Sequence, residues 1–305
     1  MNTFCTIITA SHIPYARALF ESLRKFDKDI YLNVLVVDQP EIQKGSTDGL
    51  LFHCLDAVAS SSDVGRCISE KYNKPDMQDE LRWSLKPILI TYLFEQGYEK
   101  VVFTDPDTFY FSDFKFLFGE LDENDILLTP HWRGLNPKVD NANFELQFVG
   151  GLFNGGFIAV SKNAGAAMNW WADSCLYRCE KNFSIGHYVD QTYLNLMPVY
   201  FDKVKILRHQ GCNVANWNQV VCQRELVSGE VLINRKWEIV FLHFTKSTIK
   251  GILSGDDNLL SPHLDSYMAA LSQHGLNLKL AGFKDPTAIP TNRLKKAVKD
   301  MLGRN

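Results

Sequence analysis

The segment 100–110, which reads KVVFTDPDTFY, decides the fold prediction. Its first five residues are mostly apolar and β-branched, and they predict a short buried strand. The strand runs into Asp105-Pro106-Asp107, where the proline restricts the backbone and both carboxylates can face one point. Ligands of open parallel sheets bind beyond the carboxyl ends of the strands. The acidic pair therefore occupies the position expected for chemistry.

The rest of the chain predicts strands that alternate with helices. Strands are expected over 4–9, 31–37, 100–104, 126–129, 157–160, 203–207 and 238–244, and helices after Ser11 and over 84–96, 164–178 and 189–197. The polar segment 45–79 has no sustained period, so we read it as loops around short elements. The alternation indicates an α/β fold with a Rossmann-like, mixed but mainly parallel sheet flanked by helices. We expect one main domain over 1–255 and a small helical C-terminal appendage over 256–305.

Composition describes an ordinary globular protein. The 305 residues are 46% hydrophobic and 22% charged, which allows a large core. A formal net charge of −3 offers no basic field, so no nucleic-acid partner is expected. The seven cysteines form an odd set without C-x-x-C spacing, which argues against a disulfide framework and a zinc site.

The two ends of the chain bear on its location in the cell. The first residues lack the features of a secretory signal, and no stretch reaches the ~18 to 20 apolar residues of a membrane-spanning helix. We therefore expect a cytoplasmic protein. The sequence of segment 292–305 predicts a basic amphipathic helix, which suits peripheral contact with the inner face of the membrane, and a solvated terminal helix explains the pattern equally well.

An Asp-x-Asp pair alone is weak evidence, because Asp-Pro-Asp is also an ordinary turn sequence. Here an apolar strand precedes the pair and Phe109-Tyr110-Phe111 follows it. Carboxylate oxygens are hard ligands that suit Mg²⁺ or Mn²⁺. The context therefore favours a divalent cation site over a plain turn.

Four motifs occur in one order along the chain: LRWSLKP at 81–87, VVFTDPDTFYF at 101–111, FNGGF at 153–157, and Asp190-Gln191 followed by Leu194-Asn195. This set resembles the GT-A glycosyltransferases, most closely the family-8 type that includes glycogenin and bacterial lipooligosaccharide galactosyltransferases. The likeness spans most of the first 250 residues. It implies a GT-A catalytic domain over 1–255.

The resemblance implies a metal site of three residues. Asp105 would contact both the ribose and the metal, Asp107 would bind the metal directly, and His243 in VFLHFTKS would complete the site. A histidine between Leu242 and Phe244 is otherwise read as a core residue. Lys246 would face the departing diphosphate, although this chain lacks the Gly and the Lys-Pro-Trp that usually follow the histidine.

The resemblance also implies contacts to the donor nucleotide and to the sugar. The nucleotide-binding residues would be Thr9, Ala10, Tyr15, Asp38, Lys86 and Thr104, together with Asp105 and Lys246. Lys86 can equally lie at a helix start. The catalytic residues would be Asn154, Asp190 and Gln191, with Gln191 beneath the anomeric carbon.

The FNGGF motif, Asp190 and the segment 211–218 can each be interpreted with or without a bound substrate. The glycines of FNGGF permit close backbone approach to a sugar, or they form a turn. Asp190 can accept bonds from sugar hydroxyls or cap the helix that follows. The segment 211–218 lines the acceptor side, or it is a loop closed by its own hydrogen bonds.

The predicted activity is transfer of a sugar from a nucleoside diphosphate, with UDP-sugar as donor and Mn²⁺ or Mg²⁺ as cofactor. The acceptor would be a hydroxyl of a bacterial surface glycan or a lipid-linked saccharide, and the anomeric configuration would be retained. An inverting enzyme would need a general base, for which Asp190 and Glu145 are the candidates. A non-catalytic sugar-nucleotide-binding protein is the second alternative. A nucleotidyltransferase should show a Gly-rich phosphate loop, and none follows Thr9.

Overall fold

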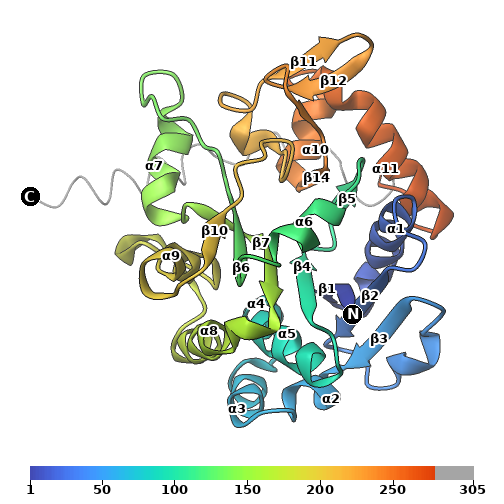
Figure 1. Ribbon diagram of the computed structural model, residues 1–305, viewed down its shortest axis with the longest axis vertical. Helices are drawn as coiled ribbons and strands as arrows, with labels where there is room; N and C mark the ends of the chain where they lie inside the picture. Colours follow the sequence, from blue (N-terminus) through green and yellow to red (C-terminus); the bar gives the residue numbers. More distant parts are fainter. Residues whose placement is uncertain (279–305) are drawn as a thin grey trace, which may run out of the picture.

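The structure is a computed structural model in which residues 1–278 are described. Within these residues seven strands form the central sheet (Figure 1). In spatial order they are β10 (Val204–Ile206), β6 (Ile126–Pro130), β7 (Phe153–Ser161), β4 (Lys100–Thr104), β1 (Asn2–Ile8), β2 (Tyr31–Val36) and β3 (Leu50–Cys54). Every neighbouring pair is parallel except those of β7, which runs antiparallel to β4 and β6. The mixed, mainly parallel sheet is therefore confirmed.

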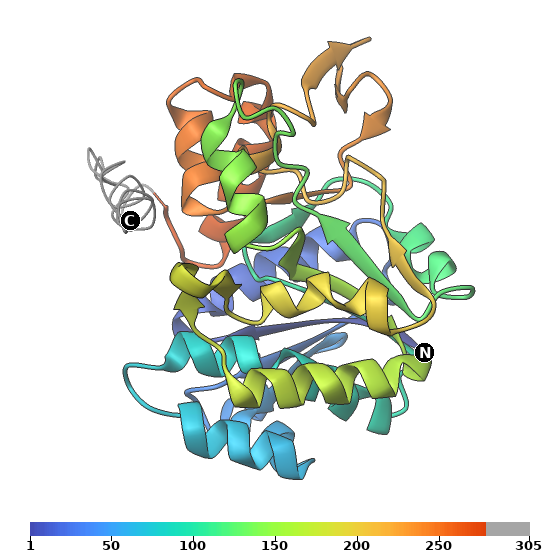
Figure 2. The same ribbon diagram turned by 90° about the vertical axis from the view of Figure 1, so that its left-hand side faces the viewer.

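Helices lie on both faces of this sheet (Figure 2). Within residues 1–278 the helices are α1 (Ile13–Arg24), α2 (Leu55–Ala59), α3 (Asp63–Tyr72), α4 (Gln78–Ser84), α5 (Lys86–Glu95), α6 (Lys115–Glu120), α7 (Asn141–Val149), α8 (Gly165–Tyr177), α9 (Met197–Tyr200), α10 (Lys246–Leu253) and α11 (Ser261–Gln273), and the last two lie beyond the faces of the sheet. The side chains of β1 alternate between two cores. Cys5 and Ile7 pack with α2 to α5 and α8, whereas Phe4 and Ile8 pack with α1 and α6.

A third core joins the C-terminal helices to a separate two-stranded sheet, in which β14 (Phe241–His243) pairs with β5 (Thr108–Tyr110). It includes residues of β5, β14, α10 and α11. The rings of Phe244 and Tyr267 stack with centroids 4.2 Å apart. Helix α11 thus shares a hydrophobic core with the segment before it, and the boundary at 255/256 stays a prediction. The predicted helix at 292–305 lies outside the described residues.

The segment 45–79, read as loops around short elements, contains the short elements β3, α2 and α3, and the Ser62 hydroxyl caps α3 by accepting a 3.0 Å bond from the Gly65 amide. Their shortness hid their periodicity in the sequence. Two other predicted elements differ from the structure. The helix predicted over 189–197 is a 3₁₀ turn, η5 (Gln191–Asn195), followed by α9. The strand predicted over 238–244 is divided into β13 (Trp237–Glu238) and β14.

The FNGGF motif does not form the turn that was one of its two interpretations. Residues 153–157 form the first half of β7, so the glycines lie inside a strand. The remaining strands are β8 (Lys181–Asn182), β9 (His187–Tyr188), β11 (Arg224–Val227) and β12 (Glu230–Ile233). No helix within residues 1–278 has both the length and the apolar character needed to cross a membrane.

Candidate metal and sugar-binding site

The acidic pair lies in a tight turn between β4 and β5. The Asp105 amide donates to the Gly156 carbonyl at 2.9 Å, which continues the pairing of β4 with β7. The Thr108 amide then donates to the Asp105 carbonyl at 3.1 Å and closes the turn. The side chains of Asp105 and Asp107 are 30% and 31% exposed. Both carboxylates thus remain accessible at the edge of the sheet.

Strand pairing brings His243 to this turn. Strand β14 runs antiparallel to β5 with His243 opposite Thr108, and the Phe244 amide donates to the Asp107 carbonyl at 2.8 Å. His243 Nε2 consequently lies 3.0 Å from Asp107 Oδ1 and 3.8 Å from Asp105 Oδ2. One ligand atom from each of the three residues lies within 4.8 Å of the others. The three predicted metal ligands therefore converge.

In the cluster of Asp105, Asp107 and His243, electrostatic attraction favours an ionised Asp107 beside a protonated His243. Burial opposes ionisation of both Asp107 and His243, but their mutual attraction is stronger. The pKa of Asp107 is therefore lowered, and the pKa of His243 is raised by Asp107 and then Asp105 despite burial. Since a metal ligand must be deprotonated, protons compete with a cation for the imidazole.

Asn154 orients the imidazole from behind. Its Nδ2 atom lies 3.0 Å from His243 Nδ1 and donates to Asn213 Oδ1 at 2.7 Å. Its Oδ1 atom accepts a 2.9 Å bond from the Gly156 amide. The Asn154 side chain is 4% exposed. It therefore fixes the histidine ring so that Nε2 faces the carboxylates.

The two glycines of β7 leave room for these side chains. A Cβ atom on Gly156 would lie 2.6 Å from Asp105 Oδ2 and 2.7 Å from His243 Cε1. A Cβ on Gly155 would lie 3.1 Å from Asp190 Oδ2 and 3.1 Å from Gln191 Cβ. Steric need, rather than turn geometry, explains both glycines.

A buried ion pair lies beside the cluster. Lys86 Nζ is 2.9 Å from Asp190 Oδ2, is 3.9 Å from Asp105 Oδ1, and donates to the Gly155 carbonyl at 2.8 Å. Burial raises the pKa of Asp190 above its usual value, although Lys86 opposes the shift. Burial lowers the pKa of Lys86, but Asp190 and then Asp105 outweigh it and the net pKa is raised. The Asp190 side chain makes no capping bond to η5, so the capping alternative is wrong.

Gln191 is held by the backbone of two glycines. Its Oε1 atom accepts a 2.8 Å bond from the Gly155 amide, and its Nε2 atom donates to the Gly150 carbonyl. Val189, two residues before Gln191, has a φ of 46°. This left-handed conformation is unusual for a β-branched residue and turns the chain so that Asp190 and Gln191 face β7.

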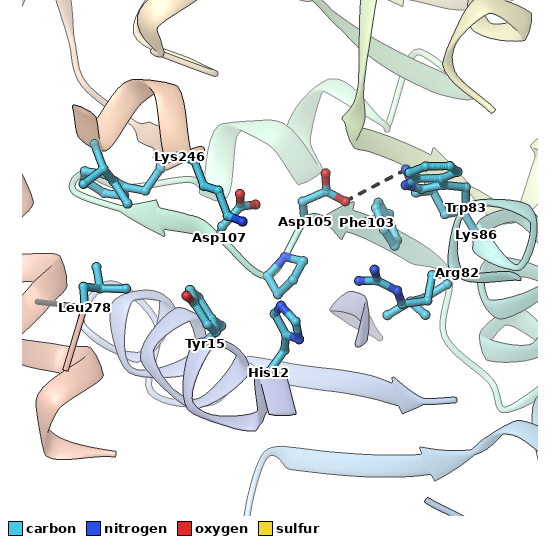
Figure 3. Close-up of a pocket in the computed structure, with 14 residues that line it drawn as sticks. His12, Tyr15, Arg82, Trp83, Lys86, Phe103, Asp105, Asp107, Lys246 and Leu278 are labelled. Carbon is cyan, nitrogen blue, oxygen red and sulfur yellow. Dashed lines mark ion pairs between the residues drawn. The ribbon is translucent and has the colours of Figure 1, made fainter. Parts of the chain in front are cut away.

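Two adjacent cavities open on either side of the acidic pair. The first cavity, of about 290 Å³, is called the β1 cavity because Ile7 of β1 lies in its wall. Its other lining residues come mainly from α1, α4, α5, the Asp105–Asp107 turn and α10. Figure 3 shows His12 and Tyr15 on one side of this cavity, with Arg82, Trp83 and Lys86 grouped near Asp105. The β7 cavity, of about 390 Å³, is lined by residues that include Asn154, Gly155, Gly156, Asp190, Gln191 and His243. Trp83, Lys86, Asp105 and Asp107 line both cavities.

Comparison with solved structures identifies this architecture. The fold is similar to that of galactosyltransferase LgtC in complex with donor and acceptor sugar analogs, with a TM-score of 0.53, 11% identity and coverage of 90% of this chain and 96% of that chain. It is also similar to apo mouse xyloside xylosyltransferase 1, with a TM-score of 0.51, 16% identity and coverage of 81% and 99%. The chain has the GT-A glycosyltransferase fold.

Sequence comparison adds relatives but no activity. No family model matches the chain. YfnF of Bacillus subtilis (strain 168) is 26% identical over 261 residues, which cover 82% of this chain and 83% of YfnF. YfnD of the same strain is 27% identical over 255 residues, which cover 81% and 78%. Both are described as uncharacterized proteins.

Some of the predicted site residues line one of the two cavities, and others lie behind the cavity walls. Tyr15 and Lys246 line the β1 cavity, and the cluster and the β7 residues lie as described above. Four predicted residues are in neither lining: Thr9, Ala10, Asp38 and Thr104. Thr9 Oγ1 bonds His12 Nδ1 at 2.9 Å, and the Ala10 amide donates to Asp38 Oδ1 at 2.7 Å. These contacts support the wall of the β1 cavity, whereas Thr104 is fully buried in the sheet.

Several cavity residues were missing from the predicted site. His12, Arg82 and Trp83 line the β1 cavity, and His131, Arg133, Tyr188 and Trp217 line the β7 cavity. Arg82 and Trp83 lie in the quoted 81–87 motif. His131 and Arg133 directly follow β6, whose carboxyl end lies at the same sheet edge as that of β4. The strand-end rule applied to β4 would have found them.

The residues of the cluster fit a divalent cation. Two carboxylates and one imidazole converge, and Gly156 leaves open the space that a larger residue would fill. Mixed oxygen and imidazole ligands at an accessible site suit Mn²⁺ or Mg²⁺ with remaining positions free for water or phosphate.

Proposed function

We propose that this protein is a metal-dependent glycosyltransferase that moves a sugar from a nucleoside-diphosphate donor to a hydroxyl acceptor. The convergence of Asp105, Asp107 and His243 between two cavities carries the proposal. A bound Mn²⁺ or Mg²⁺ would neutralise the negative charge that develops on the departing diphosphate. The GT-A fold and the four ordered motifs support the same assignment.

The β1 cavity is the proposed nucleotide site, with UDP as the nucleotide. His12 and Tyr15 provide aromatic surface beside the acidic pair, and their ring centroids are 5.3 Å apart. Lys246 enters the same cavity from α10 and supplies a positive charge for phosphate oxygens (Figure 3). Thr9, Ala10 and Asp38 act as positioning residues, because they hold His12 and the loop after β1.

The β7 cavity is the proposed site of the transferred sugar and the acceptor. Lys86 keeps the Asp190 carboxylate in place to accept bonds from sugar hydroxyls. The dipole of the Gln191 amide, fixed by Gly150 and Gly155, would stabilise positive charge at the anomeric carbon. Trp217 of the 211–218 segment lines this cavity, which supports the acceptor reading of that segment.

We further propose that the anomeric configuration is retained. An inverting reaction needs a free carboxylate as general base. Asp190 is paired with Lys86, and Glu145 is in the lining of neither cavity. The stereochemistry of the product, followed by proton NMR from the first turnover, decides the matter. The initial anomer should match that of the donor, and the opposite anomer would refute retention.

A donor-hydrolysis screen tests the proposed function. Nucleotide sugars are incubated with Mn²⁺, and release of the nucleoside diphosphate is measured. We expect at least one donor to be hydrolysed and Asp107→Asn to reduce the rate by at least about 100-fold, because the charge of one metal ligand is lost. Asp29→Asn, on the exposed surface, is the matched control and should leave the rate unchanged. Equal rates in wild type and Asp107→Asn would exclude the metal assignment, and tight donor binding without turnover would favour a binding protein.

A further inference from the structure

Arg133 lies in the wall of the β7 cavity and forms no ion pair with the residues that the structure describes. It follows β6 at the same edge of the sheet as the metal ligands. Its Nε and Nη1 atoms are shielded from solvent and make no hydrogen bond within residues 1–278. Two guanidinium nitrogens that are shielded from solvent and make no hydrogen bond are costly, so their presence requires an explanation.

The acidic groups around Arg133 already have other partners. Asp140, a carboxylate whose charge acts on Arg133, caps α7 by accepting bonds from the backbone and side-chain amides of Asn143 at 3.2 Å and 2.8 Å. In the cavity itself, Asp105 and Asp107 face His243, and Asp190 is paired with Lys86. Burial lowers the pKa of Arg133 to about 10, so the side chain stays charged at neutral pH. The cavity wall therefore holds an excess positive charge at Arg133.

Backbone strain marks the same wall. Trp132, directly before Arg133, has a φ of 54°, just as Val189 directly before Asp190 has a φ of 46°. Left-handed backbone at large or β-branched residues costs on the order of 1–3 kcal/mol and persists at ligand sites where the surrounding structure holds it. The two strained residues present Arg133 and Asp190 from two separate segments that line the β7 cavity.

We propose that Arg133 binds an anionic group, a carboxylate or phosphate, carried by the sugar or acceptor in the β7 cavity. The inference rests on the proposed function and names the class of substrate: an acidic saccharide. A guanidinium matches both anions with two parallel hydrogen bonds. Tyr188 and Trp217 line the same cavity, and the Trp217 Nε1 donor is also shielded and unpaired within residues 1–278.

The donor diphosphate is not the anion assigned to Arg133. Lys246 lines the β1 cavity and not the β7 cavity, whereas Arg133 lines the β7 cavity and not the β1 cavity. Two sources remain for the same chemistry. The transferred sugar can be a uronic acid, or the acceptor can carry the carboxylate or phosphate next to its reacting hydroxyl.

Matched substrate pairs distinguish these sources. The donor arm compares UDP-glucose with UDP-glucuronate and UDP-galactose with UDP-galacturonate, by hydrolysis and by calorimetric binding in the presence of Mn²⁺. The acceptor arm compares methyl hexosides with the corresponding uronides and 6-phosphates, by transfer from the best donor. We expect the acidic member of one arm to be preferred by at least about 10-fold. A preference in the donor arm assigns the anion to the sugar, and one in the acceptor arm assigns it to the acceptor.

Variants then assign the preference to Arg133. Arg133→Met should lower kcat/KM for the acidic member by about 10- to 100-fold and leave the neutral member within about threefold. Arg133→Lys keeps the charge but loses the paired geometry, so it should lie between the two. Arg235→Met, an exposed arginine whose ion pair with Glu225 lies on the β11 side of the molecule, is the matched control.

Two results would overturn the inference. Neutral members that bind and react as well as acidic ones in both arms contradict it without any variant. An acidic preference that survives Arg133→Met assigns the anion to other residues. The proposed function can fail while this inference holds. In that case no nucleotide sugar is hydrolysed or transferred, but calorimetry still shows that the acidic donor binds more tightly and that this preference depends on Arg133.

Discussion

Gly156 tests how closely the metal ligands are packed. A methyl group there would collide with Asp105 Oδ2 and His243 Cε1, because the Cβ would lie 2.6 Å and 2.7 Å from these atoms. We expect Gly156→Ala to weaken Mn²⁺ binding by about 10- to 100-fold, the range found when the surroundings of metal ligands are disturbed. Gly251→Ala in α10, where a Cβ meets no atom within 4 Å, is the control. Equal Mn²⁺ affinity in both variants by calorimetry would show that the cluster is not the binding site.

The Lys86–Asp190 pair should matter for stability as well as for the site. The two side chains are 5% and 1% exposed, so removing one leaves a buried charge without a partner. Lys86→Met should cost about 3–5 kcal/mol in free energy of unfolding. Lys162→Met breaks an ion pair with Glu99 in which each side chain is 57% exposed. It should cost less than about 1 kcal/mol in free energy of unfolding. Urea unfolding that shows equal losses would contradict this ranking.

At the scale of elements, His53 links the outer strand to the centre of the sheet. His53 on β3 bonds Asn33 Oδ1 on β2 at 2.8 Å, and Asn33 Nδ2 donates to Thr3 Oγ1 on β1 at 2.9 Å. Burial lowers the pKa of His53 from 6.5 to about 4, so the folded chain resists its protonation. The lowered pKa makes this contribution to stability fully present above about pH 6.5, and it is lost as the pH falls toward 4.

The corresponding variant isolates this contribution. His53→Gln keeps an amide donor near Asn33 but cannot titrate. Wild type should lose up to about 3 kcal/mol more unfolding free energy than His53→Gln between neutral pH and pH ~4. Chemical denaturation at several pH values measures the two slopes. Parallel slopes would mean that His53 titrates alike in the folded and unfolded chain.

Elements were predictable where their periodicity was long or strongly apolar. Strands β1, β2 and β4 and helix α8 follow the predicted segments closely. The helix predicted over 189–197 failed because Val189 adopts a left-handed conformation and the Gln191 side chain is held by Gly150 and Gly155. Such long-range contacts leave no local signal in the sequence, so tertiary structure overrides helical propensity there.

At the scale of the whole molecule, α11 is coupled to the metal site. Tyr267 is fully buried and stacks on Phe244, the residue after His243. Tyr267→Ala should cost about 3–5 kcal/mol of stability and also weaken Mn²⁺ binding, because the strand that carries His243 loses its support. Tyr200→Ala, at a side chain that is 71% exposed, should change neither. Thermal unfolding and Mn²⁺ titration check both effects, and unchanged Mn²⁺ affinity in Tyr267→Ala would refute the coupling.

The acidic pair and its histidine were predictable because three residue types with metal-binding chemistry occur in motif context. The contact between His243 and the acidic pair could not be predicted. It depends on the antiparallel pairing of β14 with β5, which are more than 130 positions apart in the sequence. Two further features could not be predicted: the reversed direction of β7, and the Arg133 Nε and Nη1 atoms that make no hydrogen bond within residues 1–278. Both follow from tertiary structure rather than from local pattern.

The stoichiometry of Mn²⁺ binding tests the central claim most directly. Electron paramagnetic resonance measures free Mn²⁺ during titration of wild type, His243→Ala and the double variant Asp105→Asn/Asp107→Asn. We expect one Mn²⁺ per wild-type chain, at least about 10-fold weaker binding in His243→Ala, and none in the double variant. Unchanged binding of one Mn²⁺ in the double variant would contradict the account.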